Sequence, residues 1–301
     1  PATTEIYTLS LHDALPIFVE DDEIKHDLAS RRPYRAWLDA SLGRLKDLPA
    51  GAAPAAMTAE DLTLRQQIFG YTREDVNVIL KPMAEKGEEP TGSMGTDTPL
   101  AVLSERPQLL YSYFKQLFAQ VTNPPLDAIR EELVTSMVSY LGPEGNLLGE
   151  EPGDARQLRI NNPILTNEDV EKIRATTDPA FRAVTLDCVF PAAEGPAGMK
   201  AALDRLCERA MEAIGQGARM LILSDRAADR DRAPIPMLLA MAGVGHHLIR
   251  NAARTQTGLV VESAEPREVH HFAVLFGYGA GAVNPYLALE TVRSLARAGE
   301  D

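Results

Sequence analysis

The chain has 301 residues, of which 45% are hydrophobic and 24% are charged, as expected for a globular protein with a substantial core. Its 43 acidic and 30 basic residues give a net charge of −13, which disfavours nucleic acids and anionic membranes as partners. Two cysteines, Cys188 and Cys207, are too few to cross-link a domain of this size, so we expect buried thiols in a reducing cytoplasm. No run of about 18 apolar residues predicts a membrane-spanning helix.

The first residues of the chain differ in character from the rest. Residues 1–17 resemble translated read-through of a sequencing adapter, and we expect them to lie outside the fold, although a short strand is the alternative. Residues 21–42 are charged and carry a helical pattern that Pro33 interrupts. Residues 48–54 are rich in proline and small side chains, a composition typical of a linker.

Helical signals dominate the chain from residue 58 to residue 174. Helix starts are predicted at Thr58 and Thr72, because each threonine is followed three residues later by an aspartate. Further helices are predicted over residues 105–121, 126–141 and 166–174. In the first of these, six apolar and aromatic side chains at helical spacing predict a core-facing stripe: Leu109, Leu110, Tyr113, Phe114, Leu117 and Phe118.

Strands alternate with helices in the second half of the chain. Four apolar strands are predicted over residues 183–190, 219–224, 258–263 and 280–284. The helices between and after them are predicted over residues 199–215, 236–251, 265–276 and 287–298. This alternation is typical of right-handed βαβ units with a parallel sheet. The predicted fold class is therefore α/β: a helical front half followed by an incomplete (β/α) barrel-like array of about four βα units with parallel strands.

Three acidic residues stand where predicted strands end: Asp187, Asp225 and Glu262. The carboxyl ends of parallel strands meet at one edge of a sheet, where α/β folds bind their ligands, so a cluster there is a candidate acid–base or metal site. The alternative, which the pattern favours, is that each acid caps the next helix or pairs with an arginine, as Asp225 could with Arg226.

Two further patterns favour structural roles over functional ones. The pairs His246–His247 and His270–His271 lie on predicted helices, where adjacent side chains point about 100° apart, so neither pair chelates a metal from a single face. The sequence FGYGAGA over residues 276–282 precedes a strand instead of opening a helix after one, which indicates a tight connection and not a dinucleotide-binding loop.

Two loops are dense in residues that favour turns, around residues 92–97 and over Thr122–Pro125. Neither contains a nucleophile paired with a base, a set of metal ligands or a phosphate-binding motif. The residues alone therefore predict an α/β module that positions other groups and has no demonstrable active site.

Four stretches of the chain resemble the central region of the large subunit of glutamate synthase. They are GSMGTDTPLAVLSERPQLLYSYFKQLFAQVTNPP, NNPILTNEDVEKIR, ILSDRAADRDRAPIPMLLA and VVESAEPREVHHFAVLFGYGAGAVNPYLALET, and the resemblance extends from about Glu60 to Thr291. Two positions depart from the family pattern, Thr96 where aspartate is common and Gly245 where a third histidine is common. Neither change removes a catalytic group.

The resemblance implies a fragment of an enzyme that converts glutamine and 2-oxoglutarate to two molecules of glutamate. Residues 18–57 would then be the tail and linker of an N-terminal amidotransferase domain, residues 58–291 the central domain, and residues 292–301 the start of a linker toward a C-terminal flavin domain. These two domains are the expected partners in a cytoplasmic enzyme. The resemblance places the nucleophilic cysteine, the FMN and the 3Fe–4S cluster in those domains, so this chain is expected to hold no cofactor and to be inactive alone.

Within the family the central domain connects the catalytic domains and helps to wall a channel for ammonia. The resemblance therefore implies that Thr122, Asn123, Pro124 and Pro125 line the channel, although a helix-starting turn is the alternative. It also implies a loop that faces the flavin domain, formed by Gly92, Ser93, Met94 and Gly95. No catalytic or metal-binding residue is expected. The rival hypothesis is a free-standing α/β enzyme that uses Asp187, Asp225 and Glu262.

Overall fold

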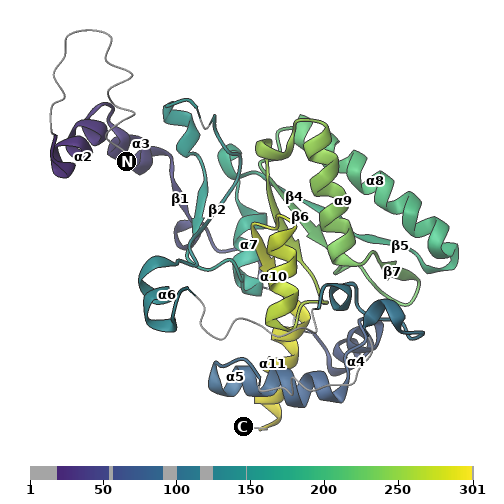
Figure 1. Ribbon diagram of the computed structural model, residues 1–301. Helices are drawn as coiled ribbons and strands as arrows, with labels where there is room; N and C mark the ends of the chain where they lie inside the picture. Colours follow the sequence, from purple (N-terminus) through teal and green to yellow (C-terminus); the bar gives the residue numbers. More distant parts are fainter. Residues whose placement is uncertain (1–18, 54–56, 91–99, 116–124, 147, 300–301) are drawn as a thin grey trace.

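The computed structural model describes residues 19–53, 57–90, 100–115, 125–146 and 148–299 (Figure 1). The predicted read-through segment, the loop Gly92–Gly95 and residues Thr122–Pro124 lie outside the described residues. Within the described residues, no helix is both long enough and apolar enough to cross a membrane.

The four strands predicted for the second half form one open parallel sheet. In spatial order they are β4 (Ala183–Asp187), β6 (Met220–Ser224), β8 (Gly258–Glu262) and β9 (Ala282–Asn284). Spatial order follows chain order, and a helix lies between successive strands, as in βαβ units. The sheet does not close on itself, so the predicted α/β class with an incomplete, barrel-like array is confirmed.

Both faces of this sheet are buried. Alternate residues such as Leu221, Leu223 and Val261 face a core that the helices α8 (Gly195–Gly215), α9 (Met237–Arg250) and α10 (Val269–Gly277) complete. The intervening residues Met220, Ile222 and Val260 face a second core with α7 (Asn167–Ala175) and a small sheet. Burial on both faces explains why these strands are nearly continuous apolar runs instead of alternating apolar and polar residues.

Two small sheets were not predicted from the sequence. The first contains β1 (Gly43–Arg44), β3 (Leu158–Ile160) and β2 (Ser139–Leu141) in that order, and it covers the α7 side of the parallel sheet. The second pairs β5 (Val189–Pro191) with β7 (Arg232–Pro234) in antiparallel fashion. The predicted strand over residues 183–190 is therefore two strands, β4 and β5, separated at the buried residue Cys188.

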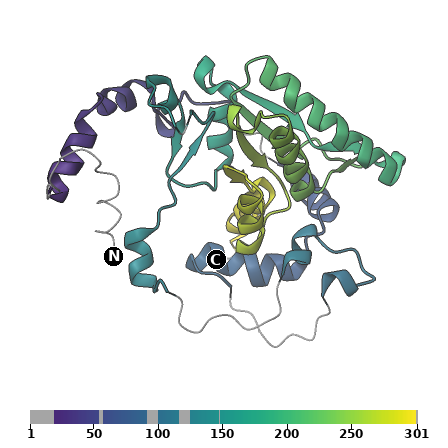
Figure 2. The ribbon, with the colours of Figure 1, turned by 45° about the horizontal axis from the view of Figure 1, so that its top comes forward.

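Most helices of the front half begin where the sequence predicts. They are α2 (Asp21–Ser30), α3 (Tyr34–Ser41), α4 (Ala59–Ile68), the π-helical turn η2 (Asp75–Leu80), α5 (Lys81–Lys86) and α6 (Ala128–Val134). The hydroxyl of Thr58 accepts from the main-chain N–H of Asp61 at 3.1 Å, and Thr72 and Asp75 exchange the same kind of bond. In both views α2 and α3, in purple, lie apart from the parallel sheet (Figures 1 and 2).

The end of the chain closes the carboxyl edge of the sheet. The last helix, α11 (Tyr286–Ala298), packs against α4, and Gln66 donates to the hydroxyl of Thr291 at 3.0 Å. Short 3-10 turns connect the larger elements: η1 (Leu45–Asp47), η3 (Ala101–Leu103), η4 (Leu110–Phe114), η5 (Pro152–Ala155), η6 (Pro179–Phe181), η7 (Ala192–Glu194) and η8 (Arg254–Gln256).

The prediction of a helix over residues 105–121 is wrong for residues 105–115, the part that the structure describes. Residues 105–109 are irregular, and residues 110–114 form the single 3-10 turn η4. A 3-10 turn has about three residues per turn instead of 3.6, so the side chain that points inward changes. Tyr111 is buried, whereas Tyr113 and Phe114, predicted to be core, are 50% and 40% exposed. Leu117 and Phe118 lie outside the described residues.

The helix predicted over residues 126–141 is also too long. Helix α6 ends at Val134, and after an irregular stretch the chain continues into β2. Val134 and Thr135 are β-branched and disfavour helix continuation, while Ser139–Leu141 pair with β3.

The start of α10 also differs from the prediction. This helix begins at Val269 and not at residue 265, because Pro266 disfavours helical geometry in the residue before it.

The FGYGAGA stretch is a tight helix-to-strand connection, as predicted. After α10 the main-chain N–H of Ala280 donates to Leu275 at 3.1 Å, and Gly279 has a φ of +98°, which favours glycine. A side chain at Gly281 would lie 2.7 Å from Leu141, so a residue without Cβ is required where β9 begins.

Candidate functional site at the carboxyl edge of the sheet

The carboxyl ends of the parallel strands bring several polar residues together. The register places Ser224 beside Glu262 and Glu262 beside Asn284, and Asp225 follows directly after β6. Ser224, Asp225, Glu262 and Asn284 are at most 2% exposed. This edge is the place where the sequence predicts a carboxylate cluster.

Glu262 is held by three donors. Its Oε2 accepts from the hydroxyl of Ser224 at 2.6 Å and from Arg174 Nη2 at 2.8 Å. Its Oε1 accepts from Arg226 Nε at 2.5 Å. Glu262 is fully buried, whereas the two arginine side chains are 31% exposed, so the positive charges remain partly hydrated. Glu262 therefore forms buried ion pairs with two arginines, Arg174 and Arg226, and Arg226 is the residue that the sequence offered as a partner for Asp225.

Asp225 has no cationic partner among the described residues. Its Oδ2 accepts from the hydroxyl of Ser263 at 2.5 Å, and the main-chain N–H of Ala264 donates to Oδ1 at 3.1 Å. Complete burial raises the pKa of Asp225 to about 7, because the charged carboxylate loses its hydration, and the nearby charge of Glu262 adds to the shift. Its hydrogen bonds oppose the shift only in part.

Asp187 is not part of this arrangement. Its side chain is exposed, and no hydrogen bond or ion pair joins it to Asp225 or Glu262 among the described residues. The predicted three-acid cluster is therefore not formed. The two acids that do lie together are inaccessible to solvent, so a substrate atom has no route to them, and the arrangement supports the structural alternative over a free-standing active site.

Asparagines extend the network toward α7 and α11. Asn284 donates to the side-chain oxygen of Asn167 at 3.0 Å, and Asn167 donates to Glu290 at 2.8 Å. Arg293 then bridges Glu290 and Glu168, both at 2.8 Å. Sequence reasoning missed Asn167, although it directly follows the correctly predicted helix cap at Thr166. These bonds fix the two helices to the strand ends.

The histidine pairs and the cysteines form no metal site in the described part of the chain. His246 is exposed on α9, whereas His271 is buried at the start of α10. Cys188 and Cys207 are both free and buried, as predicted, and burial raises the pKa of each thiol. A raised pKa leaves the thiol protonated and unreactive at neutral pH.

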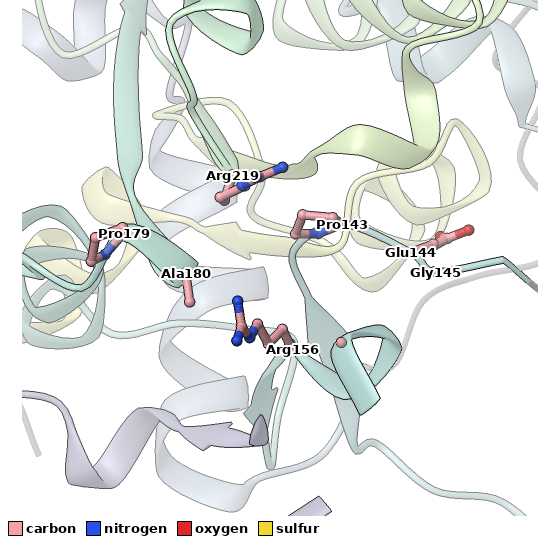
Figure 3. A pocket seen from close by; sticks show the side chains of 8 residues that line it. Pro143, Glu144, Gly145, Arg156, Pro179, Ala180 and Arg219 are labelled. Carbon is pink, nitrogen blue, oxygen red and sulfur yellow. The ribbon is translucent and has the colours of Figure 1, made fainter. Parts of the chain in front are cut away.

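A surface hollow of about 290 Å³ lies at the opposite, amino edge of the sheet (Figure 3). Arg219, just before β6, and Arg156, just after η5, line it together with Pro143 and Pro179. Both arginines are exposed, and neither takes part in an ion pair within the described residues. The hollow has a net positive charge, because Glu144 is the one acidic residue among the described residues that line it, beside the two arginines. Since both arginines are exposed to water, they are not held in place to bind a ligand.

Of the loop residues predicted to be functional, only Pro125 is described, and it is exposed. Asp127, two residues later, caps α6 by accepting from the N–H groups of Ile129 and Arg130 at 3.0 and 2.9 Å. The helix that follows the predicted channel loop therefore has a start signal of its own.

The described residues thus form an α/β domain with an open parallel sheet, in which the polar cluster at the strand ends is sealed from solvent. The sequence model of one protein family, the glutamate synthase central domain, matches residues 64–301, and the chain belongs to this family.

Curated relatives agree with this assignment. The chain is 44% identical over 275 residues to the glutamate synthase [NADPH] large chain of Bacillus subtilis, with 91% of this chain and 18% of the relative covered. It is 42% identical to glutamate synthase [NADH] of Schizosaccharomyces pombe, with 93% of this chain and 14% of the relative covered. It is 44% identical to the chloroplastic ferredoxin-dependent glutamate synthase of Spinacia oleracea, with 91% and 17% covered. The chain thus spans less than a fifth of the length of these relatives.

Proposed function

We propose that this chain is the connecting and channel-forming module of a glutamate synthase and is not catalytic by itself. The parent enzyme would convert glutamine and 2-oxoglutarate to two molecules of glutamate. The observation that supports this proposal most is the placement of exposed apolar side chains. More than half of the exposed large hydrophobic residues in the described part of the chain lie between Leu100 and Leu148. Exposed apolar side chains that gather in this way are typical of segments that other domains cover.

These exposed apolar residues come from four elements, η3, η4, α6 and β2, and from the loops beside them. Ile129, Leu133 and Val134 of α6 are 79%, 81% and 64% exposed, and Leu103 of η3 is 72% exposed. We use the term apolar face for the exposed apolar residues between Leu100 and Leu148, which lie in two separate places, on the segment 100–115 near α4 and on and around α6 (Figures 1 and 2). In the proposal, the amidotransferase and flavin domains of the same parent chain are the partners that cover it, in a cytoplasmic enzyme.

The cofactors of the proposed reaction, FMN and a 3Fe–4S cluster, belong to the flavin domain in this proposal. The residues of this chain do not fit an iron–sulfur cluster, because such clusters are held by several cysteine thiolates and this chain has only two cysteines. Both are buried with raised pKa values, which disfavours the thiolate form. In this proposal the chain therefore holds the catalytic domains in position and binds no cofactor itself.

For the channel itself, we propose that Thr122, Asn123, Pro124 and Pro125 form part of the wall, and that Gly92–Gly95 face the flavin domain. A wall for ammonia needs a fixed backbone, few competing donors and weak polar contacts. The two prolines restrict the backbone and present no N–H group, while threonine and asparagine offer short polar side chains.

The test is a Thr122→Trp substitution in the full-length enzyme, with Thr177→Trp, on an exposed loop, as a matched control. A coupled enzyme forms two glutamates per glutamine, whereas escape of ammonia leaves one. We expect Thr122→Trp to lower this ratio and release free ammonia, with ammonia-dependent synthesis preserved and the control unchanged. A ratio that stays at two would show that the loop is only the turn before α6.

A further inference from the structure

The segment 100–115 has little structure of its own, yet it carries part of the apolar face. It contains only the short 3-10 turns η3 and η4, which cannot hold a fixed shape in isolation. Tyr111 is the one buried residue in this segment, and its side chain is 0% exposed. The neighbouring Val102, Leu103 and Tyr113 are at least 50% exposed. Its position must therefore come from contacts with the rest of the domain.

Most of those contacts are made with the start of α10, and at the end of the same helix Phe114 packs edge-on against Tyr278, with ring centroids 5.7 Å apart. The ring of Tyr111 stacks on the imidazole of His271, with centroids 4.5 Å apart and planes inclined by 27°. His270 Nε2 donates to the main-chain carbonyl of Tyr111 at 3.1 Å. Lys115 forms an ion pair with Glu268 at 3.1 Å. Three residues at the start of one helix thus hold both the side chain and the backbone of the segment.

The receiving surface is itself rigid. His271 is 2% exposed, and its Nδ1 accepts from the main-chain N–H of Arg267 at 3.3 Å, which fixes the ring. Burial lowers the pKa of His271 to about 4, so the ring is neutral and the stack persists at neutral pH. The side chain of Tyr111 also joins the core beneath α8, α9 and α10.

The tyrosine hydroxyl is buried near the carboxyl group of Glu265 and makes no hydrogen bond of good geometry within the described residues. The ring, and not the hydroxyl, therefore makes the contacts that hold the segment, and phenylalanine at this position keeps them.

From this geometry we propose that Tyr111 is a positioning residue, which fixes segment 100–115 on α10 and so presents its part of the apolar face to the other domains of the parent chain. The inference rests on the proposed connecting function. Among the contacts that hold the segment, the inference assigns the largest share to the one fully buried ring, and it makes the transfer of ammonia between domains depend on the resulting placement. Tyr111 touches no reacting atom.

The experiment compares three variants in full-length glutamate synthase. Tyr111→Ala removes the anchor, Tyr111→Phe keeps the ring, and Phe181→Ala removes a buried ring on the opposite face of the sheet as a control for lost stability. We expect Tyr111→Ala to move the yield from two glutamates per glutamine toward one, with free ammonia released. Tyr111→Phe and Phe181→Ala are expected to stay coupled, and ammonia-dependent synthesis is expected to be kept in all three.

A second measurement follows the segment directly. Trypsin cleavage after Lys115 is expected to accelerate about tenfold or more in Tyr111→Ala, because the released segment can adopt the extended form that a protease binds, and to be unchanged in the other two variants. If Tyr111→Ala does not fold, Tyr111→Leu keeps the apolar volume without the stack and takes its place.

The outcomes separate the two proposals. Tight coupling in Tyr111→Ala, or equal uncoupling in Phe181→Ala, would overturn the positioning role. Rapid cleavage together with tight coupling would overturn it as well, because the segment would then be released without any effect on transfer. If Tyr111→Ala uncouples the enzyme while Thr122→Trp does not, the positioning role stands and the channel-wall assignment fails.

Discussion

The parallel-sheet region, residues 183–298, and the front segment between residues 100 and 148 use the same apolar residue types with opposite results. In the sheet, Leu221, Leu223 and Val261 are fully buried, because the helices α8, α9 and α10 cover their face. In the front segment, Leu133 and Leu103 are more than 70% exposed. The parallel sheet is covered on both faces, one of them by α7 and the small sheet, whereas the front segment leaves much apolar surface uncovered in the described residues. The difference indicates that the sheet region supplies most of the stability, and it is consistent with the contact role proposed for the front segment.

The largest expected effect concerns the sealed edge of the sheet. Glu262→Ala removes the acceptor of Ser224, Arg174 and Arg226, and breaking such a buried network typically costs roughly 3–5 kcal/mol. Glu262→Gln, which keeps the shape, is expected to cost less. Denaturant unfolding of the 301-residue chain measures both. A cost below about 1 kcal/mol for the alanine variant would mean that the arginines rehydrate and the network contributes little.

The next effect tests the comparison with one residue type in each region. Leu223→Ala, at 0% exposure in the sheet, is expected to lower the free energy of unfolding by about 2–5 kcal/mol. Leu133→Ala, at 81% exposure on α6, is expected to change it by less than about 0.5 kcal/mol. Thermal and denaturant unfolding of the two variants give the measurement. Similar losses at both positions would contradict the division into a buried and a contact region.

A smaller effect concerns pH. The pKa of Asp225 is about 7 in the folded protein, against an ordinary value of 3.8, so the folded state binds more protons between these values. The stability that this group contributes is therefore complete below about pH 4 and is lost as the pH rises through about 7. Asp225→Asn cannot ionise, so its unfolding free energy should fall less between pH 5 and pH 8 than that of the wild type, by on the order of a few kcal/mol.

Glu265 supplies the internal control for this measurement. Burial and the charge of Asp225 raise its pKa to about 7 as well, so it leaves a residual slope of the same sign in Asp225→Asn. Equal slopes in the two proteins would show that Asp225 is hydrated in solution.

Local signals predicted much of this fold. The four parallel strands follow from apolar runs, and the caps at Thr58 and Thr166 follow from spacing, because each depends on residues close together in the chain. The small sheets could not be predicted, since strands of two or three residues such as β1 and β3 carry no periodicity and depend on long-range pairing. The loops around Gly95 and Asn123 lie outside the described residues, and their proposed roles remain predictions.

The buried edge shows where prediction of the site reached its limit. Strand-end positions correctly placed Asp225 and Glu262 at one edge, but the sequence does not reveal that Arg174, 88 residues from Glu262, reaches the same carboxylate. Likewise, helical spacing selected Tyr113 and Phe114 as core, while the tighter turn at η4 buried Tyr111. Both errors arise from tertiary contacts that override the local pattern.

The packing of α4 against α11 has a consequence for synthesis of the chain on the ribosome. Strands that neighbour each other in space also follow each other in the chain, so the sheet can grow in the order in which its strands emerge. Helix α4 emerges first of all these elements, yet Arg65 and Gln66 find their partners, Tyr286 and Thr291, only after more than 220 further residues have been made. Until then its partly buried side chains are unprotected, and the interval of exposure is set by the rate of translation and not by the rate of folding.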